Sequence, residues 1–257
     1  MDYLHFEAQE NVAVLTIQSP PANALASYIL KDLSTALDRI QDDSTYKAIV
    51  LKGEGKFFSA GADIKEFTSL QEESEYSKLS RQGQELFNRI ENFHIPVIAS
   101  IHGASLGGGL ELAMSCHMRI VTEDAKLGLP ELSLGIVPGF AGTQRLPRYV
   151  GQPKAYEMIL TGEPISGVEA ASLGLANKAV PAEQLEEETM KLAGKVAAKS
   201  GPSVQAIMRL IPYSNTSLYE KGQLEEAEEF GKVFGNDDAK EGVQAFIEKR
   251  KPNFKDQ

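Results

Sequence analysis

The sequence predicts an α/β fold followed by a helical C-terminal region. Short apolar runs, such as Ala48–Leu51 and Val97–Ile101, are each followed by a glycine-containing loop and a segment with helical spacing. Repeated strand–loop–helix units of this kind favour parallel pairing of the strands in one core. Beyond about residue 183 the apolar residues recur with helical spacing only, and no good strand candidate is left.

Length and composition are those of one large globular domain, or of a domain with an appendage. The chain has 257 residues, of which 42% are hydrophobic and 24% charged, and it can bury a sizeable core. The formal charge of −10 argues against nucleic acid or an anionic membrane as the main partner. The single cysteine, Cys116, excludes an internal disulfide framework and a cysteine metal cluster.

Neither a membrane span nor a targeting segment is apparent. No apolar run reaches the length needed to cross a bilayer. The first residues lack the basic and apolar pattern of a signal peptide and the Arg-rich pattern of a transit peptide. We therefore expect a cytoplasmic protein.

The first third of the chain predicts two strands, a helix and a third strand. Residues 3–18 form two strands around a turn at Gln9–Asn11. Ser27 is the expected N-cap of a helix whose apolar positions end at Ile40. The strand Ala48–Leu51 then leads into a glycine-containing loop.

The middle and the end of the chain continue the pattern. The polar segment 66–82 is expected to be a solvated surface helix or a mobile flap, and a helix is expected over 83–93. Strands follow at Val97–Ile101 and Met118–Thr122. The expected C-terminal helices are 183–199, 203–211, 216–234 and 237–250.

The stretch from Ile98 to Met114 is the most informative part of the sequence. A buried strand runs into the three consecutive glycines Gly107–Gly109 and then into a helix. This order presents free backbone N–H groups at a helix N-terminus. Three glycines weaken a helix start, so we expect a ligand to approach this backbone closely. Glu111 lies in the first helical turn.

Three other interpretations of the glycine turn fail. No G-x-G-x-x-G dinucleotide pattern fits it, and no Gly-Lys-Ser/Thr of a P-loop follows. Gly103-Ala104-Ser105-Leu106-Gly107 does match the G-x-S-x-G elbow of serine hydrolases. However, the only histidine after Ser105 is His117, and a serine without its general base is a weak nucleophile.

Two carboxylates suggest acid–base chemistry. Each has an ordinary alternative, because Glu111 suits the helix dipole and Glu131 can be a solvated turn residue. Three glycine-bearing loops, at 53–63, 103–109 and 135–142, surround the two glutamates in the sequence. The residues alone thus indicate a candidate acid–base site.

The sequence resembles the crotonase, or enoyl-CoA hydratase, family nearly from end to end. The motifs that carry the resemblance are Asn23–Leu25, Phe58–Lys65, Gly103–Met114, Gly128–Glu131, Gly135–Gly139, Gly142–Leu146 and Phe246–Lys251. The resemblance implies a spiral of ββα units over residues 1–195. It also implies a helical region over 196–257 that builds trimers, often paired into hexamers.

The resemblance also implies a substrate and a set of site residues. The substrate is a coenzyme A thioester, with no separate cofactor and no metal. Backbone N–H groups of Ala62 and Gly108 form the oxyanion hole, Glu111 and Glu131 are the acid–base pair, and Gly139 helps to hold the water. The residues implied in coenzyme binding are Ala24, Leu25, Ala60, Ala62, Asp63, Ile64, Lys65, Phe246 and Lys249, the last two reaching a neighbouring subunit's coenzyme.

In the family that the sequence resembles, hydratases carry both glutamates, so the resemblance implies hydration of a trans-2-enoyl-CoA to a 3-hydroxyacyl-CoA, as in β-oxidation or related catabolism. A Δ3–Δ2 enoyl-CoA isomerase and a non-catalytic coenzyme-binding protein are the alternatives. Two departures stand out. Pro20-Pro21-Ala22 replaces a basic residue that grips coenzyme phosphates in many hydratases, and Phe140-Ala141 replaces a smaller pair.

Overall fold

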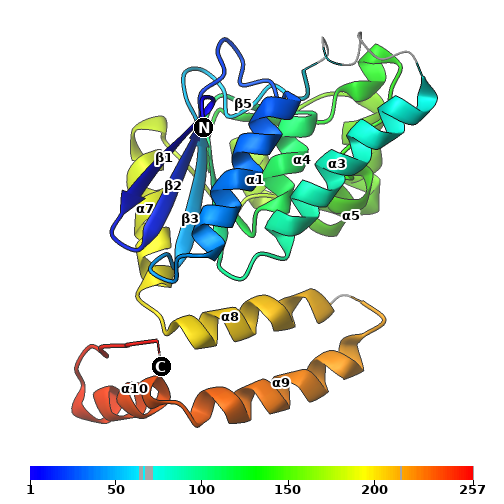
Figure 1. Ribbon diagram of the computed structural model, residues 1–257. Coiled ribbons are helices and arrows are strands. Elements are labelled where there is room, and N and C mark those ends of the chain that lie inside the picture. The colour runs from blue at the N-terminus through cyan, green and yellow to red at the C-terminus, as the bar shows by residue number, and fades with distance from the viewer. Residues whose placement is uncertain (64–65, 67–71, 215, 257) are drawn as a thin grey trace.

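The main body of the protein is a parallel-rich sheet covered by helices on both faces (Figure 1). The computed structural model describes residues 1–63, 66, 72–214 and 216–256. Within these residues the larger sheet has the strand order β1 (Leu4–Gln9), β2 (Val12–Ile17), β3 (Ala48–Gly53), β4 (Val97–Ile101), β6 (Met118–Thr122) and β9 (Lys178–Val180). Only β1 and β2 pair antiparallel, and the other neighbours are parallel. The predicted α/β class is confirmed.

Alternate residues of the central strands face two separate apolar cores. On β2, Leu15 and Ile17 point into the larger core, whereas Val12 and Val14 point into the smaller one. A strand buried on both faces reads as a continuous apolar run, as β2 does. The larger core lies under α1 (Ser27–Gln41), α3 (Glu73–Glu91), α4 (Gly108–Ser115) and α5 (Gly142–Thr161). The smaller one lies under α7 (Leu185–Ala197).

A second, small sheet begins with the strand that follows β4 in the chain. In the described residues it consists of β5 (Ala104–Leu106), β7 (Lys126–Gly128) and β8 (Ile165–Ser166), with α6 (Gly167–Ser172) directly after β8. The sequence analysis missed these strands, because two or three residues are too few to show an alternating pattern.

The start of α1 corrects one prediction. Its N-cap is Ala26, which makes no side-chain cap, and Ser27 is the first helical residue. The N–H group of Ser27 donates to both carboxylate oxygens of Glu66, at 3.0 and 2.9 Å, and its hydroxyl donates to the same carboxylate at 2.7 Å. A residue 39 positions away thus satisfies the helix end that Ser27 was expected to cap.

The helix α3 runs without interruption from Glu73 to Glu91. The surface helix that was one alternative for 66–82 is therefore present over 73–82, but it is continuous with the helix expected over 83–93 and not separate from it. A capping box between Glu72 and Glu75 starts it. Residues 73–82 are therefore helical, and the part of the expected flap at 67–71 lies outside the described residues.

The C-terminal helices form a separate layer beside the body (Figure 1). They are α8 (Gly201–Leu210), α9 (Tyr219–Phe234) and α10 (Asp237–Glu248), which confirms the predicted helical region. The end of the chain ties this arm to the body, because the Asp256 carboxylate accepts from the Gly201 N–H at 2.7 Å and pairs with Lys47 at 2.8 Å. The domain division at residue 195 stays a prediction. None of the described helices is long and apolar enough to cross a bilayer.

Candidate active site

The three consecutive glycines of the turn between β5 and α4 serve different purposes. Gly107 adopts φ +52° and ψ −127°, a conformation that side chains strongly disfavour. A Cβ on Gly109 would lie 2.3 Å from the carbonyl oxygen of Ser59, so this residue allows α4 to pack against the neighbouring loop. Gly108 is neither strained nor crowded to that degree. Its missing side chain instead leaves its own N–H group accessible.

The amides of Ala62 and Gly108 lie side by side. A Cβ on Gly108 would stand 3.2 Å from the nitrogen of Ala62, and a Cβ on Gly61 would stand 3.6 Å from the nitrogen of Gly108. Gly61 itself has φ +110°, which turns the chain so that the next amide reaches α4. Neither N–H group donates to an acceptor in the part of the chain that the structure describes. Two adjacent free donors suit an oxygen that gains negative charge.

Glu111 is buried beside these amides, with 1% of its surface exposed. Its Oε1 accepts hydrogen bonds from the N–H groups of Phe140 at 2.8 Å and Gly142 at 2.7 Å. The pKa of Glu111 is raised to about 7: burial is the largest cause and the charge of Glu131 acts in the same direction, while the two amides and Arg145 oppose the rise. A carboxyl with a pKa near neutrality is suited to general base or acid catalysis.

Glu131 faces the same space from the start of the 3-10 helix η1 (Glu131–Leu134). Its Oε1 would lie 3.0 Å from a Cβ on Gly107. Its Oε2 is buried and has no hydrogen-bond partner among the described residues, which is uncommon for a buried polar atom. Burial also raises the pKa of Glu131. The structure thus brings together two carboxylates with raised pKa values and two free amides.

The loop that carries Gly139 closes one side of the site and is held by residues that sequence analysis did not single out. The Gly139 carbonyl accepts hydrogen bonds from Ser80 Oγ at 2.5 Å and Gln84 Nε2 at 2.9 Å, both on α3. The carbonyl of Phe140 accepts from the buried Arg145 at 2.8 Å. Ser80 and Gln84 lie 55 or more residues before Gly139 in the sequence, and Arg145 is one polar residue within a helical pattern. No local sequence signal therefore marks any of the three.

Phe140, the noted departure from the family pattern, is buried next to the free amides. Its ring lies between α3 and α4: a Cβ on Gly83 would come within 2.3 Å of Cε1, and one on Gly108 within 3.3 Å of Cδ2 and Cε2. Phe87 packs edge-on against the ring at 5.3 Å between centroids. The phenyl ring is therefore a wall of the site.

The other predicted contacts to the coenzyme lie on two neighbouring loops. The Leu25 N–H donates to the Gly61 carbonyl at 2.7 Å, and the Ala60 N–H donates to the Ala22 carbonyl at 2.9 Å. Ala24 and Asp63 flank these bonds in the chain. The two remaining predicted residues, Ile64 and Lys65, lie outside the described residues.

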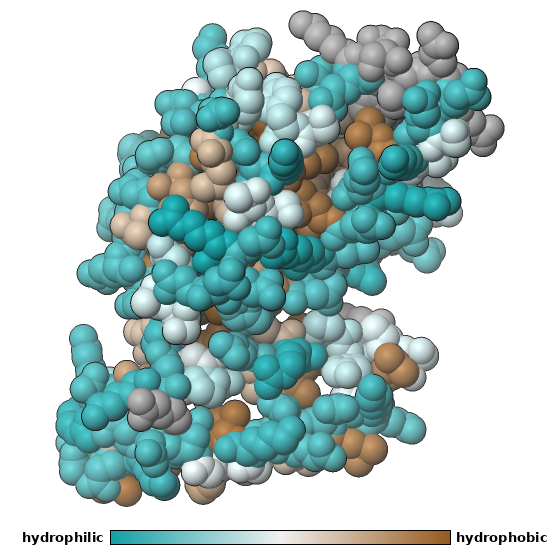
Figure 2. All heavy atoms as spheres, in the orientation of Figure 1, coloured by the Kyte–Doolittle hydropathy of each residue, from teal (hydrophilic) through white to brown (hydrophobic). Residues whose placement is uncertain are grey.

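The predicted contacts from the C-terminal arm are not brought to this site. Phe246, on α10, is 85% exposed, and Lys249 is the exposed C-cap of the same helix with φ +56°. The arm lies apart from the site within one chain (Figure 1). Figure 2 shows apolar side chains on the surface of the arm. Other exposed apolar residues of the arm are Leu224, Phe230, Phe234 and Ile247.

The structure supports the rejection of a serine hydrolase. Both ring nitrogens of His117 are engaged by backbone, Nδ1 by the Val97 N–H at 2.9 Å and Nε2 by the Glu91 carbonyl at 3.2 Å. Burial lowers the pKa of His117 to about 4. Ser105 has no hydrogen-bond partner for its hydroxyl among the described residues, so no base is positioned to activate it.

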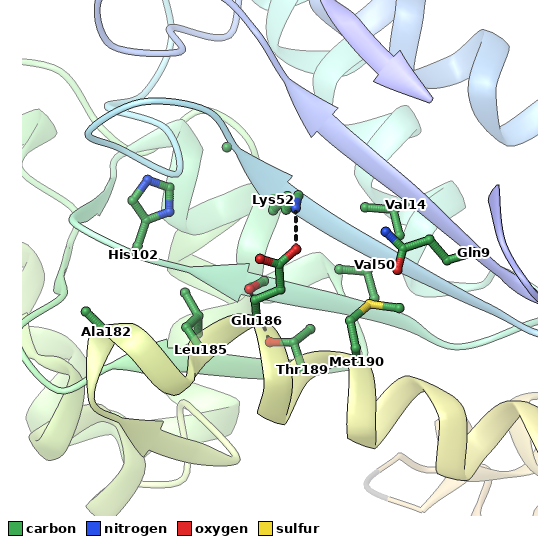
Figure 3. A pocket seen from close by; sticks show the side chains of 12 residues that line it. Gln9, Val14, Val50, Lys52, His102, Ala182, Leu185, Glu186, Thr189 and Met190 are labelled. Atoms are coloured by element: carbon green, nitrogen blue, oxygen red, sulfur yellow. Dashed lines mark hydrogen bonds and ion pairs between the residues drawn. The ribbon is translucent and has the colours of Figure 1, made fainter. Parts of the chain in front are cut away.

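A cavity of about 310 Å³ lies on the opposite face of the sheet, between β2–β4 and α7 (Figure 3). Four of its polar side chains are paired with each other, Lys52 with Glu186 at 3.2 Å and Thr189 with Ser100 at 3.1 Å. It contains none of the predicted site residues. Within the described residues, no group of three or more His, Cys, Asp or Glu side chains is placed to hold a metal ion.

A free pair of amides beside two carboxylates with raised pKa values is chemically suited to proton transfer to and from a compound whose oxygen becomes negatively charged. Comparison with known proteins identifies its class further. The profile of the enoyl-CoA hydratase/isomerase family matches residues 7–257, and the chain belongs to this family.

Named relatives and solved structures agree with this membership. A probable enoyl-CoA hydratase of Bacillus subtilis is 56% identical over 257 residues, covering 99% of each chain. A crotonyl-CoA hydratase of Syntrophomonas wolfei is 41% identical over 96% of each chain. The crystal structure of an enoyl-CoA hydratase from Bacillus anthracis superposes with a TM-score of 0.94 at 34% identity, covering 99% of this chain and all of that one. The crotonase-type fold expected from the sequence is confirmed.

Proposed function

We propose that this protein is an enoyl-CoA hydratase that adds water to the double bond of a trans-2-enoyl-CoA, in syn geometry, and releases a 3-hydroxyacyl-CoA. The observation that carries the proposal is the pairing of Glu111 and Glu131 beside the free amides of Ala62 and Gly108. Hydration needs a base for the water and an acid for the α-carbon. The site provides one carboxyl for each.

The amides of Ala62 and Gly108 bind the thioester oxygen of the substrate. Ionised Glu111 removes a proton from the water, whose oxygen then forms a bond to C3. The electron pair of the double bond moves toward the thioester oxygen, giving an enolate that the two N–H groups stabilise. Protonated Glu131 then donates its proton to C2, and the enolate returns to a thioester.

The surroundings of the two carboxyls support this division of roles. Glu111 keeps Oε1 fixed by the amides of Phe140 and Gly142, so Oε2 can bind the water together with the Gly139 N–H. Glu131 has a buried oxygen with no donor in the described part of the chain, an arrangement that favours its protonated form. When two carboxyls interact strongly, their apparent pKa values belong to the pair and not to either residue. The base is the carboxyl of the pair that is ionised, and the acid is the one that is protonated.

The coenzyme extends from the thioester along the loops that pair at Leu25 and Ala62. Ala24, Leu25, Ala60, Ala62 and Asp63 line its path, and Ile64 and Lys65 are assigned to it from the sequence alone. The substrate's coenzyme moiety is the only coenzyme that the reaction uses.

The C-terminal arm builds a homotrimer or a dimer of trimers. Exposed side chains on this arm support the assembly, since Leu224 is 70% exposed, Phe230 68% and Phe246 85%. In such an assembly Phe246 and Lys249 reach the coenzyme of the neighbouring chain. Cytoplasmic location and a place in β-oxidation or related acyl-CoA breakdown stay predictions.

One assay tests the activity and separates it from its alternatives. Crotonyl-CoA in water should lose the absorbance of its conjugated thioester and yield 3-hydroxybutyryl-CoA. Conversion of a 3-enoyl-CoA to the 2-enoyl isomer without hydration would instead support an isomerase. A folded protein that leaves crotonyl-CoA, longer enoyl-CoA esters and the 3-enoyl substrate unchanged would be a non-catalytic member. Crotonyl-CoA is the first substrate to use, because two relatives are named crotonyl-CoA hydratase and short-chain-enoyl-CoA hydratase.

A further inference from the structure

One face of α3 contacts the loop that holds Glu111. Ser80, Gly83, Gln84 and Phe87 follow the spacing i, i+3, i+4, i+7, which places them on one side of a helix. All four touch the segment Gly139–Phe140. The proposed reaction mechanism assigns no role to any residue of α3.

The contacts converge on a single peptide unit. Its carbonyl oxygen, on Gly139, accepts from Ser80 Oγ at 2.5 Å and Gln84 Nε2 at 2.9 Å. Its N–H group, on Phe140, donates to Glu111 Oε1 at 2.8 Å. The peptide group is planar, with its C=O and N–H pointing in opposite directions. Holding the oxygen toward α3 therefore aims the N–H at Glu111.

The ring of Phe140 adds a steric contact on the same face. Gly83 has no side chain, and a Cβ there would come within 2.4 Å of two ring carbons. The absence of a side chain at Gly83 leaves room for the ring against α3, and Phe87 packs edge-on against it. Two donors and this space thus fix both the plane and the position of the peptide.

We propose that Ser80 and Gln84 are positioning residues for Glu111: they orient the Gly139–Phe140 peptide, and through its N–H group they hold the carboxylate that activates water. The kinetic part of this inference depends on the proposed hydratase function. The structural part does not, because the hydrogen bond from Phe140 to Glu111 exists whatever the reaction.

Loss of this orientation has a defined direction. The Phe140 N–H stabilises the charged form of Glu111, so its loss raises the pKa of that carboxyl further above its usual range. The charged groups that act on Glu111 from other elements are Glu131 on η1 and Arg145 on α5, and the substitutions below leave both in place. Since Glu111 must be ionised to accept a proton, the acid limb of the rate profile moves to higher pH.

The test compares two double variants of the same helix. Ser80→Ala with Gln84→Leu removes both donors to Gly139. Ser77→Ala with Gln82→Leu makes the same chemical changes at exposed positions of α3, whose side chains donate no hydrogen bond to Gly139 in the described part of the chain. The pH dependence of kcat on crotonyl-CoA is measured for both. So is the titration of the Glu111 carboxylic-acid band by infrared difference spectroscopy, with the band assigned by its absence in Glu111→Gln.

For the double variant at 80 and 84 we expect the Glu111 titration and the acid limb of kcat to shift together to higher pH. At pH 7 we expect kcat to fall roughly 10- to 100-fold, the scale of a small misplacement of a catalytic group. The control at 77 and 82 should match the wild type. An infrared titration that is the same in both double variants would overturn the inference.

Two further measurements keep the inference separate from folding and from the proposed function. Should the double variant not fold, Ser80→Ala alone removes one of the two donors and should shift the titration in the same direction. Its failure to do so overturns the inference equally. A wild-type protein without hydratase activity would refute the proposed function, whereas the infrared titration would still decide the role of Ser80 and Gln84.

Discussion

Gly108→Ala is the sharpest test of the two-amide site. The new methyl carbon would stand 3.2 Å from the Ala62 nitrogen and 3.3 Å from two ring carbons of Phe140. An oxyanion bound by the two amides has to lie 2.7–3.1 Å from each nitrogen. The methyl group therefore takes the volume that the thioester oxygen needs, although both N–H groups remain.

The size of the effect follows from this overlap. Loss of one oxyanion donor typically costs about 10²–10³ in kcat, and the methyl obstructs both, so kcat/KM should fall by at least roughly 10²-fold. Contacts of 3.2–3.3 Å require shifts of only a few tenths of an ångström, so the fold should be retained. Crotonyl-CoA hydration gives kcat/KM, and urea unfolding gives the stability.

Gly194→Ala is the matched control. Gly194 lies within α7, and a Cβ there meets nothing within 4 Å. This variant should be more stable than the wild type by about 0.5–1 kcal/mol, with unchanged activity. A folded Gly108→Ala protein with wild-type kcat/KM would refute the assignment of the thioester oxygen to these amides.

Four further outcomes follow from the same geometry. Glu131→Gln should lower kcat at least about 10²-fold, the usual scale for a lost acid–base group, with little change in the binding of a non-reactive acyl-CoA measured by calorimetry. Since Glu111 acts in its ionised form and its pKa is raised to about 7, kcat should fall as the pH drops through about 7; an acid limb near the ordinary glutamate value of 4.5 would contradict this role. Gly83→Ala should destabilise the protein by about 1–3 kcal/mol through overcrowding; measured by urea unfolding in a Phe140→Ala background, which lacks the crowding ring, the same substitution should cost much less. Asn23→Ala should cost roughly 2–4 kcal/mol by the same measurement, because its 2%-exposed side chain bonds three backbone groups; a cost below 1 kcal/mol would mean that water replaces it.

The regular elements could be predicted from local pattern, because burial on one or two faces imposes a period on the sequence. The strands Val97–Ile101 and Met118–Thr122 agree with the structure to the residue. The short strands of the second sheet could not be predicted, since three residues carry no period. The prediction that Ser27 caps α1 was wrong for a different reason. The carboxylate of Glu66, distant in sequence, accepts the hydrogen bond of the first helical N–H group.

Some residues of the site could likewise be predicted from the sequence and others could not. The glycine turn and Glu111 are adjacent in sequence, so local chemistry suggested them as a site. Glu131 was a second candidate carboxylate from the residues alone, and its role as the partner of Glu111 came from the family resemblance, as did the amide of Ala62; the structure brings them to the same place. Ser80 and Gln84 could not be found by either route, because each is an ordinary polar residue of a surface helix whose partner lies 55–59 positions further on.

The acid–base strength of Glu111 is set by a balance that the two flanking amides keep. Burial and the charge of Glu131 shift the carboxyl toward its protonated form, and a protonated carboxyl cannot take a proton from water. Hydrogen bonds from Phe140 and Gly142 favour the charged form and oppose burial. More donors would lower the pKa further and weaken the base. Both amides donate to Oε1 of Glu111, which leaves Oε2 available to the water. The pKa stays near 7 because these two hydrogen bonds stabilise the buried charge. They do so at the oxygen that does not react.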